Sequence, residues 1–349
     1  MPTIQIAGRN IGPGEPAYII AELSANHGQD FTQAVEIVRA AHSAGADAVK
    51  LQTYTADTLT IQSGKDYFRA GKGTLWEGRT LHDLYCEAYT PWEWQPELKR
   101  IANDLGLHLF STPFDATAVD FLEQMDVPAY KIASFELVDL PLIRRVAATG
   151  KPVIMSTGMA TLQEIEEAVE AARTAGVSAL ALLKCTSAYP ASPDEMHLRT
   201  IPHLSRMFGV PAGLSDHTLG IAVPVAAVAL GACIVEKHIT LSRATPGPDS
   251  AFSLEPHEFK DMVDAIRTAE RALGAVRYGA SEREAASRNF RRSLFITEDV
   301  RAGSPLTPDN VRSIRPANGL PPKHYGEVLG RRVARDVERG TPLSWELLA

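Results

Sequence analysis

Short runs of apolar and β-branched residues alternate with stretches of helical periodicity along the first 280 residues. Short apolar runs bounded by glycine or polar residues are typical of buried strands, whereas longer 3.6-residue periodicity is typical of helices. We therefore predict eight strands, at residues 17–23, 48–53, 108–112, 129–134, 152–157, 179–186, 211–216 and 234–240.

The segments between these runs carry helix start and stop signals. Thr161, with Glu164 three residues later, predicts a capped helix start, and Gly176 predicts the end of that helix. Asp30 predicts a second start of the same kind. Eight strand–helix units favour an α/β fold of the closed (β/α)8 TIM-barrel type over an open doubly wound sheet, because no G-x-G-x-x-G follows the first strand. Residues 55–91 are then a long insertion after the second strand.

The last part of the chain differs in character. The pattern D-V-x-x-G-[ST]-P-L-[ST] occurs at residues 299–307 and again at 336–344. Glycine beside serine or threonine and proline is typical of turns between short extended segments. We expect a barrel domain at 1–280, a linker at 281–292, and a small β-rich domain with internal two-fold similarity at 293–349.

Composition narrows the class of protein. The chain has 349 residues, 45% hydrophobic and 22% charged, as folded globular proteins do. A net charge of −7 argues against broad electrostatic binding of nucleic acid or anionic lipid. The longest apolar stretch, 219–235, contains proline and glycine and is a poor membrane span, and the first residues lack a signal-peptide pattern. With three cysteines that lack metal-type spacing, we expect a cytoplasmic protein.

Polar side chains follow nearly every predicted strand, at the barrel face where active sites lie. Strand alternation places Lys50 and Gln52 on one face, and likewise Glu236 and His238. His217 ends the strand next to that of His238, and two neighbouring imidazoles with nearby carboxylates predict a divalent-metal site. The carboxylates that we expect near the two histidines are those of Glu22 and Asp249.

Two lysines and several hydroxyl groups are predicted at the same face. Lys50 and Lys131, together with hydroxyl-bearing residues, suit a small phosphorylated or carboxylated anion. The equal alternative is that each buried lysine only balances a carboxylate such as Glu136. We interpret Cys185 as a small buried apolar residue. The hydroxyl-bearing residues are Ser134, Ser156 and Ser215.

Taken in barrel order, eight short phrases resemble the sialic acid synthase family. They are A-E-L-S-A-N-H at 21–27, V-K-L-Q-T at 49–53, F-S-T-P-F-D at 110–115, Y-K-I-A-S at 130–134, S-T-G-M at 156–159, C-T-S-A-Y-P at 185–190, L-S-D-H-T at 214–218 and E-K-H at 236–238. The tail, with R-P-A-N-G at 315–319, resembles that family's C-terminal antifreeze-like domain, also called a SAF or β-clip domain.

The resemblance implies condensation of phosphoenolpyruvate with an open-chain amino-sugar aldehyde, assisted by a divalent metal, usually Mn2+. Phosphate is released and a nine-carbon 2-keto acid remains. It implies a homodimer in which the SAF domain of one subunit covers the partner's barrel and delivers Arg315. The implied metal ligands are His217 and His238, and the implied catalytic residues are Glu22, Lys50, Lys131, Glu236 and Asp249. The implied substrate-binding residues are Gln52, Ser134, Glu136, Ser156, Ser187, Tyr189, Ser215 and Arg315.

Within the family, the insertion phrases at 73–81 and 89–94 resemble the branch that makes pseudaminic acid. The serine at position 187 supports this resemblance, because the N-acetylneuraminate branch usually carries asparagine at that position. The resemblance implies 2,4-diacetamido-2,4,6-trideoxy-L-altrose as the aldehyde and bacterial surface glycans, such as modified flagellin, as the destination. For Trp92 and Trp94 we favour ordinary packing within the loop. For Trp76 we leave open whether it only packs in the loop or also belongs to the site.

Three alternatives remain at this point. The same chemistry on another sugar would give N-acetylneuraminic or legionaminic acid. A Schiff-base aldolase would use Lys131 or Lys184 as its nucleophile. A carbohydrate- or ice-binding module would account for the tail but leaves the charged barrel mouth unexplained. Which of Glu22, Glu236 and Asp249 activates water also stays open.

Overall fold

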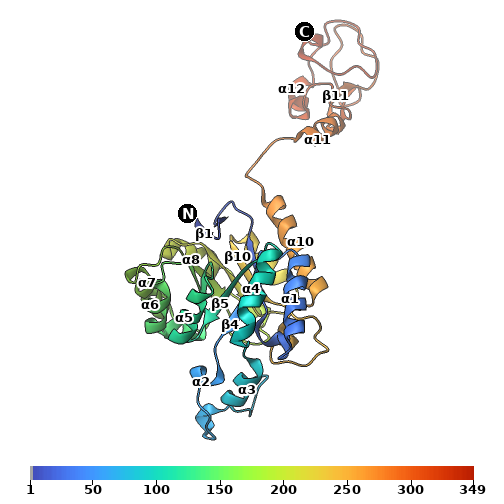
Figure 1. The fold of residues 1–349 in the computed structure, drawn as a ribbon. Coiled ribbons are helices and arrows are strands. Elements are labelled where there is room, and N and C mark those ends of the chain that lie inside the picture. The colour runs from blue at the N-terminus through green and yellow to red at the C-terminus, as the bar shows by residue number, and fades with distance from the viewer. Residues whose placement is uncertain (1–2) are drawn as a thin grey trace. The chain divides into compact units, whose positions relative to one another are not determined.

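Eight parallel strands close into a barrel in the computed structural model, which describes residues 3–349 (Figure 1). Each strand pairs with its neighbours in chain order, and the last strand pairs with the first to close the ring. Each predicted run overlaps one of these strands, so the TIM barrel is confirmed. The barrel strands are β3 (Tyr18–Glu22), β4 (Ala48–Thr53), β5 (His108–Pro113), β6 (Tyr130–Ile132), β7 (Val153–Ser156), β8 (Leu180–Cys185), β9 (Ala212–Asp216) and β10 (Ile234–His238).

Helices surround the barrel and share one apolar core with its strands. The helix starts predicted from sequence are confirmed. Thr161 and Glu164 cap α7 reciprocally, and the Asp30 carboxylate accepts two backbone N–H groups at the start of α1. The helices are α1 (Phe31–Ser43), α4 (Gln95–Asp104), α5 (Ala116–Gln124), α6 (Leu140–Ala147), α7 (Leu162–Thr174), α8 (Thr200–Phe208), α9 (Ala222–Ala229) and α10 (Pro256–Leu273).

The predicted insertion lies between β4 and α4 and carries two helices of its own, α2 (Ala56–Leu59) and α3 (Leu81–Ala88). The Thr80 hydroxyl caps α3 by accepting the backbone N–H of Asp83. Both helices project together from one end of the barrel (Figure 1). Because the insertion follows the carboxyl end of β4, it lies on the side of the barrel that carries the polar strand ends.

A short hairpin precedes the barrel and was not apparent in the sequence. It is formed by β1 (Ile4–Ile6) and β2 (Arg9–Ile11). Arg9 pairs with Asp47, which also lies 3.2 Å from Arg267 on α10. This ion-pair network ties the hairpin and α10 to the start of β4 and contributes stability rather than chemistry.

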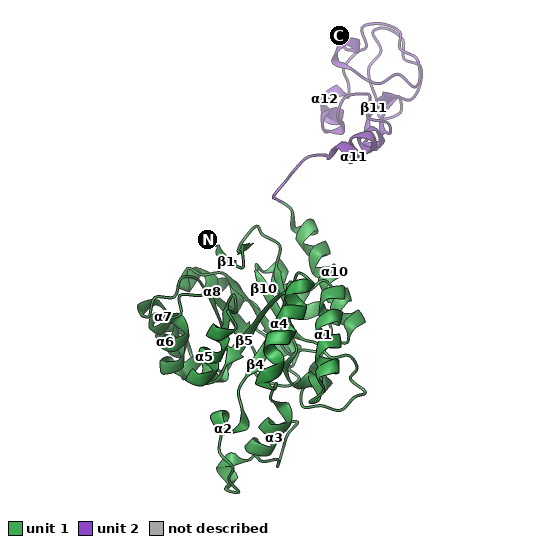
Figure 2. Ribbon diagram, in the orientation of Figure 1, with its two compact units in different colours: residues 1–274 green, residues 275–349 purple. Residues whose placement is uncertain are grey.

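Residues 275–349 form a second compact unit, separate from residues 1–274 (Figure 2). Its antiparallel pair is β11 (Ser293–Ile296) with β12 (Val311–Ile314), and two short helices, α11 (Glu282–Ala285) and α12 (Tyr325–Val328), belong to the same unit. This unit has an apolar core of its own. The prediction of a small β-rich domain is confirmed.

The two copies of the repeated sequence pattern contact each other reciprocally in this unit. Val300 and Val337 exchange both backbone hydrogen bonds, at 2.9 and 2.8 Å. Asp299 accepts the backbone N–H of Arg339, three residues after Asp336, and Asp336 accepts that of Ala302 in the same way. The predicted internal two-fold similarity therefore exists in the structure as a pair of equivalent contacts.

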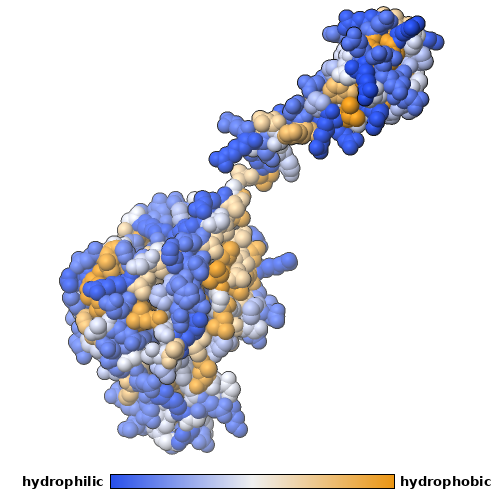
Figure 3. Space-filling model, turned by 90° about the vertical axis from the view of Figure 1, so that its right-hand side faces the viewer, coloured by the Kyte–Doolittle hydropathy of each residue, from blue (hydrophilic) through white to orange (hydrophobic). Residues whose placement is uncertain are grey.

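The surface is mainly polar on the face shown in Figure 3, where apolar residues form separate patches. None of the helices within residues 3–349 has the length and hydropathy needed to cross a membrane.

Candidate active site

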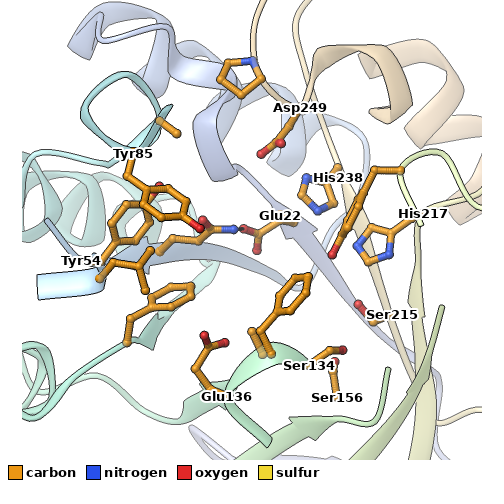
Figure 4. A pocket seen from close by; sticks show the side chains of 18 of the residues that line it. Glu22, Tyr54, Tyr85, Ser134, Glu136, Ser156, Ser215, His217, His238 and Asp249 are labelled. Atoms are coloured by element: carbon orange, nitrogen blue, oxygen red, sulfur yellow. Dashed lines mark hydrogen bonds between the residues drawn. The ribbon is translucent and has the colours of Figure 1, made fainter. Parts of the chain in front are cut away.

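A pocket of about 380 Å³ opens among the carboxyl ends of the barrel strands (Figure 4). This volume lies in the range of small-molecule sites. Lys50 and Gln52 on β4 both line it, as do Glu236 and His238 on β10, in agreement with the strand alternation expected from sequence. The other predicted residues that line it are Glu22, Lys131, Ser134, Glu136, Ser156, Tyr189, Ser215, His217 and Asp249.

Glu22 and Lys50 form a buried ion pair at the ends of neighbouring strands. Lys50 Nζ lies 2.5 Å from Glu22 Oε2, and both residues are at most 3% exposed. Gln52 Nε2 donates to Glu22 Oε1 at 3.1 Å, and Lys50 donates to the Thr112 hydroxyl at 3.3 Å. Buried ion pairs are costly unless further hydrogen bonds satisfy them, and here those bonds fix both side chains toward the pocket.

A second buried cluster surrounds Glu236. Its Oε1 accepts the Ser215 hydroxyl at 3.0 Å and lies 3.7 Å from Lys131 Nζ and 3.9 Å from Lys50 Nζ. Lys131 also donates to the Ser156 hydroxyl at 2.7 Å. Two ammonium groups and two hydroxyl groups therefore gather around the Glu236 carboxylate, and an anionic ligand bound in this part of the pocket would share them with that carboxylate.

The two carboxyl groups in these clusters differ in proton affinity. Burial raises the pKa of Glu22 to about 7, although Lys50 acts against this shift. Burial also acts to raise the pKa of Glu236, but the positive charges of Lys131 and Lys50 outweigh it and lower that pKa. Neighbouring groups whose pKa values are driven apart are typical of sites that need both an acid and a base.

Glu136 is a further carboxyl group in the pocket, in the turn after β6. Its Oε2 atom is buried and has no hydrogen-bond partner among residues 3–349. Burial raises the pKa of Glu136 to about 7. Both buried lysines form their ion pairs with other carboxylates, so Glu136 is not the counter-ion that the sequence allowed.

His217 and His238 lie side by side at the ends of β9 and β10, with ring centroids 5.3 Å apart. His217 Nδ1 is 3.1 Å from the Thr186 carbonyl oxygen, which can only accept, so Nδ1 carries a proton and Nε2 is the nitrogen that a metal ion could bind. His238 Nδ1 is buried without a partner within the described chain, and burial and His217 hold the pKa of His238 well below its usual range. Burial acts to lower the pKa of His217, but its contacts with the Cys185 thiol and the Thr186 carbonyl outweigh burial and raise it. A divalent metal ion bound to this pair would take the place of a proton on His217 Nε2.

The protein supplies only part of such a coordination sphere. Across residues 3–349, no three histidine, cysteine, aspartate or glutamate side chains are grouped as a metal site. An ion held by this histidine pair would therefore take its remaining ligands from substrate or water, which is the open arrangement of catalytic metal sites.

Asp249 joins the site from the loop after β10. Its carboxylate accepts the hydroxyl of Ser24, which in turn accepts from Gln52 Nε2 at 3.0 Å. Burial raises the pKa of Asp249. The preceding residue, Pro248, accepts the indole N–H of Trp76 at 3.0 Å. The insertion is thereby attached to the loop that presents Asp249.

Trp76 is part of the pocket rather than only of the loop's own packing. Its ring lies 5.7 Å from that of Tyr189, which lies 4.5 Å from the ring of His217. Trp92 and Trp94, in contrast, pack on Phe121 and Phe31 at the outside of the barrel. The structure therefore agrees with the prediction that Trp92 and Trp94 serve packing.

Gly158, just after β7, allows two serines to approach closely. Its backbone N–H donates to Ser134 Oγ at 3.1 Å. A Cβ atom at this position would lie 2.2 Å from Ser187 Oγ and 2.6 Å from Ser134 Oγ. Any side chain would therefore displace these hydroxyl groups, so glycine is required here for a compact polar cradle.

Two of the predicted site residues do not line the pocket as the structure has it. Ser187 is half-buried and lies beside the cradle at Gly158, next to the pocket residue Tyr189. Arg315 is exposed and follows β12 in the C-terminal unit.

Sequence reasoning missed the apolar side of the pocket. Leu81, Leu84, Tyr85 and Ala88 on α3 line it at helical spacing, and Tyr54 lies beside them. The spacing is visible in the sequence, but it equally predicts a helix face packed on a core. Gly158 and Ser24 lie within sequence phrases that resemble the sialic acid synthase family, but the sequence predicted no role in the site for either residue.

Comparison with known proteins agrees with this geometry. Residues 37–278 match the NeuB family and residues 291–349 match the SAF domain. The chain is 44% identical over 331 residues to pseudaminic acid synthase of Helicobacter pylori, which covers 95% of this chain and 97% of that protein. It is 37% identical to N,N'-diacetyllegionaminic acid synthase of Legionella pneumophila, covering 96% and 95% of the two chains. The crystal structure of N-acetylneuraminic acid synthetase from Leptospira borgpetersenii superposes with a TM-score of 0.73 at 30% identity, covering 82% and 95%.

These matches exclude the aldolase and the binding module as the principal activity, because the family consists of metal-dependent enzymes that use phosphoenolpyruvate. With a TIM barrel, a SAF domain and similarity along nearly the whole chain, this protein belongs to the NeuB family of nonulosonic acid synthases.

Proposed function

We propose that this enzyme is a pseudaminic acid synthase, which condenses phosphoenolpyruvate with 2,4-diacetamido-2,4,6-trideoxy-L-altrose and water to give pseudaminic acid and phosphate. The observation that carries the proposal is the 44% identity to pseudaminic acid synthases over 95% of the chain, combined with the buried pocket described above. The legionaminic acid branch, at 37% identity, is the alternative product.

Phosphoenolpyruvate would bind where the two ammonium groups converge. Lys50 and Lys131 are buried and face the same part of the pocket, so they neutralise phosphate and carboxylate oxygens in a site of low dielectric. Ser156 and Ser215 supply hydroxyl donors beside them. Ser134, with Ser187 beside it, extends this polar surface toward Gly158.

The sugar aldehyde would bind near the two histidines. His217 Nε2 and His238 Nδ1 are the nitrogens available to hold a divalent metal, for which Mn2+ is our proposal. Such an ion supplies a Lewis acid that polarises the aldehyde oxygen toward attack by the enol carbon. Gln52, Glu136 and Tyr189 line the same pocket and would orient the rest of the sugar.

After the carbon–carbon bond forms, water must add to a cationic centre at C2. Three carboxyl groups line the pocket, those of the buried Glu22 and Glu236 and that of the half-buried Asp249. A carboxylate in this position stabilises the developing positive charge and accepts the proton of the attacking water. Glu236 is the carboxyl group among them whose pKa is lowered, and its buried Oε2 lacks a partner in the described chain.

We also propose a homodimer in which the partner's SAF domain covers the barrel mouth. Large apolar side chains are exposed in the loops after three barrel strands, with Phe135 57%, Met159 61% and Leu219 59% exposed. Exposed apolar residues gathered at one end of a domain favour a protein contact there. Arg315 is exposed in the SAF domain and would reach the partner's pocket across this contact.

The location follows from the proposed substrates. Phosphoenolpyruvate is a cytoplasmic metabolite, so we propose that the enzyme works in the cytoplasm and supplies a sugar for surface glycans such as those on flagellin.

A competition experiment tests the proposed product. The enzyme is incubated with phosphoenolpyruvate, Mn2+ and an equimolar mixture of the altrose-configured diacetamido sugar, its mannose-configured isomer and N-acetylmannosamine. We expect pseudaminic acid as the main product by mass spectrometry and NMR. Legionaminic or N-acetylneuraminic acid as the main product would contradict the proposal while leaving the family unchanged.

A further inference from the structure

The pocket has two chemically different sides (Figure 4). His217, His238 and Ser215 lie on one side, and Tyr54 and Tyr85 lie opposite them. We define the apolar wall as the set of apolar and aromatic residues on this opposite side, namely Tyr54, Leu59, Leu81, Leu84, Tyr85 and Phe114.

The insertion builds half of this wall with one face of α3. Leu81, Leu84, Tyr85 and Ala88 stand at positions i, i+3, i+4 and i+7, which is a single helical face. In an ordinary barrel helix such a face packs on the core. Here all four residues line the pocket, and Leu84 is only 6% exposed.

Aromatic rings hold the wall in place behind this helix. The Tyr54 ring meets that of Tyr85 edge-on at 5.7 Å and that of Phe114 at 5.1 Å. Tyr54 is itself only 3% exposed, and the indole N–H of Trp92 donates to its carbonyl oxygen. The wall is therefore a preformed apolar surface and not a flexible loop that happens to lie nearby.

A hydroxyl-rich sugar end does not match this surface. Against its leucine and ring-carbon surface, away from the two tyrosine hydroxyls, a ligand hydroxyl group loses hydrogen bonds to water without regaining them, whereas a methyl group gains by leaving water. Glu136 faces the pocket with a buried oxygen that lacks a partner among residues 3–349. An acceptor of this kind near an apolar surface fits an acetamido group, which offers an N–H donor and a methyl group together.

We propose that the apolar wall selects aldehydes whose far end carries methyl groups, namely the methyl of a 6-deoxy carbon and the methyls of acetamido groups. Leu81 and Leu84 are then specificity-determining residues. This inference rests on the proposed function and deepens it by assigning sugar selection to α3. A hydrophobic site discriminates between ligands differing by one small group by about 10- to 100-fold.

The test compares two sugars that differ at one carbon. Phosphate release is measured with 2,4-diacetamido-2,4,6-trideoxy-L-altrose and with its 6-hydroxy counterpart, for the wild type, Leu84→Asn and Leu81→Asn. Leu75→Asn is the matched control, because Leu75 belongs to the same insertion, is 51% exposed and does not line the pocket. Circular dichroism checks folding, and Leu81→Asn, at the less buried first position of α3, serves if Leu84→Asn fails to fold.

We expect the wild type to prefer the 6-deoxy sugar and the ratio of the two kcat/KM values to fall about 10-fold or more in the wall variants. The KM for phosphoenolpyruvate and the behaviour of Leu75→Asn should not change. A wild-type preference for the 6-hydroxy sugar would overturn both the inference and the proposed function. A wild-type preference for the 6-deoxy sugar that persists unchanged in the folded wall variants would overturn the inference alone.

Discussion

The indole N–H of Trp76 donates to the carbonyl oxygen of Pro248 at 3.0 Å and so joins the insertion to the loop after β10. Asp249 follows Pro248 directly, and the Trp76 ring also lies against Tyr189. One side chain from the insertion therefore supports both the loop that presents Asp249 and the sugar-side residue Tyr189.

Replacing Trp76 by phenylalanine should weaken sugar binding without abolishing catalysis. The variant keeps an aromatic ring beside Tyr189 but loses the hydrogen bond, whose net worth is about 1 kcal/mol. We expect the KM for the sugar to rise about 5-fold and the KM for phosphoenolpyruvate to stay unchanged. Trp94→Phe is the control, because Trp94 packs on Phe31 away from the pocket. An unchanged sugar KM in Trp76→Phe would show that this contact is not needed.

Gly158→Ala should impair the binding of phosphoenolpyruvate. The new methyl group would lie within 2.6 Å of the hydroxyl groups of both Ser134 and Ser187 and would displace them. Hydrogen bonds to a charged ligand contribute about 1.5–3 kcal/mol, so we expect the KM for phosphoenolpyruvate to rise about 10-fold or more. Gly64→Ala, where a Cβ atom meets nothing within 4 Å, should behave as the wild type. A Gly158→Ala enzyme with normal kinetics would remove these serines from the anion site.

Glu136 predicts a pH dependence of stability. Its pKa is raised to about 7 by burial, partly opposed by Lys131 and Lys50 and supported by Asp139. A raised pKa means that the native state binds this proton more tightly than the unfolded state. The associated stability is fully present below about pH 4.5 and is lost as the pH rises through about 7.

Glu136→Gln removes this ionisation and should gain stability relative to the wild type between pH 5 and pH 8. The midpoint of urea unfolding, measured across that range, reports the difference. Glu166→Gln, at an exposed position on α7, is the control and should show a constant difference from the wild type. A difference for Glu136→Gln that does not grow with pH would contradict the assignment of a buried, readily protonated carboxyl group.

The histidine pair predicts a metal site that can be measured without the reaction. His217→Ala and His238→Ala should each lower the affinity for Mn2+ by about 100-fold, since each removes one of two protein ligands. Isothermal titration calorimetry or the electron paramagnetic resonance signal of free Mn2+ gives the affinity. His203→Ala removes an exposed histidine on α8 and should bind as the wild type does. Normal affinity in both site variants would exclude this pair as the metal site.

The barrel could be predicted from the sequence because its strands are buried on both faces. Runs such as 48–53 and 234–240 begin with two apolar residues and carry their polar residues from the third position on, and this pattern predicts both the strand and the residues that face the pocket. The repeated D-V-x-x-G phrase was equally informative, because Asp299 and Asp336 bond to each other's turns.

The apolar half of the pocket could not be predicted in the same way. The face of α3 that carries Leu84 and Tyr85 has the spacing of a core-packing face, and only its position over the barrel mouth makes it a pocket wall. The ion-pair partners of Lys50 and Lys131 could not be predicted either. Spacing along a strand predicts which face a side chain is on, but it does not predict which of Glu22, Glu236 and Glu136 lies within 4 Å of a lysine.

The most direct test of the central claim is phosphate release from phosphoenolpyruvate with Mn2+, with each sugar alone and with or without EDTA. We predict rapid, EDTA-sensitive release with the altrose-configured diacetamido sugar and little release with N-acetylmannosamine. Efficient release with N-acetylmannosamine, or release that persists after the metal is removed, would contradict the account.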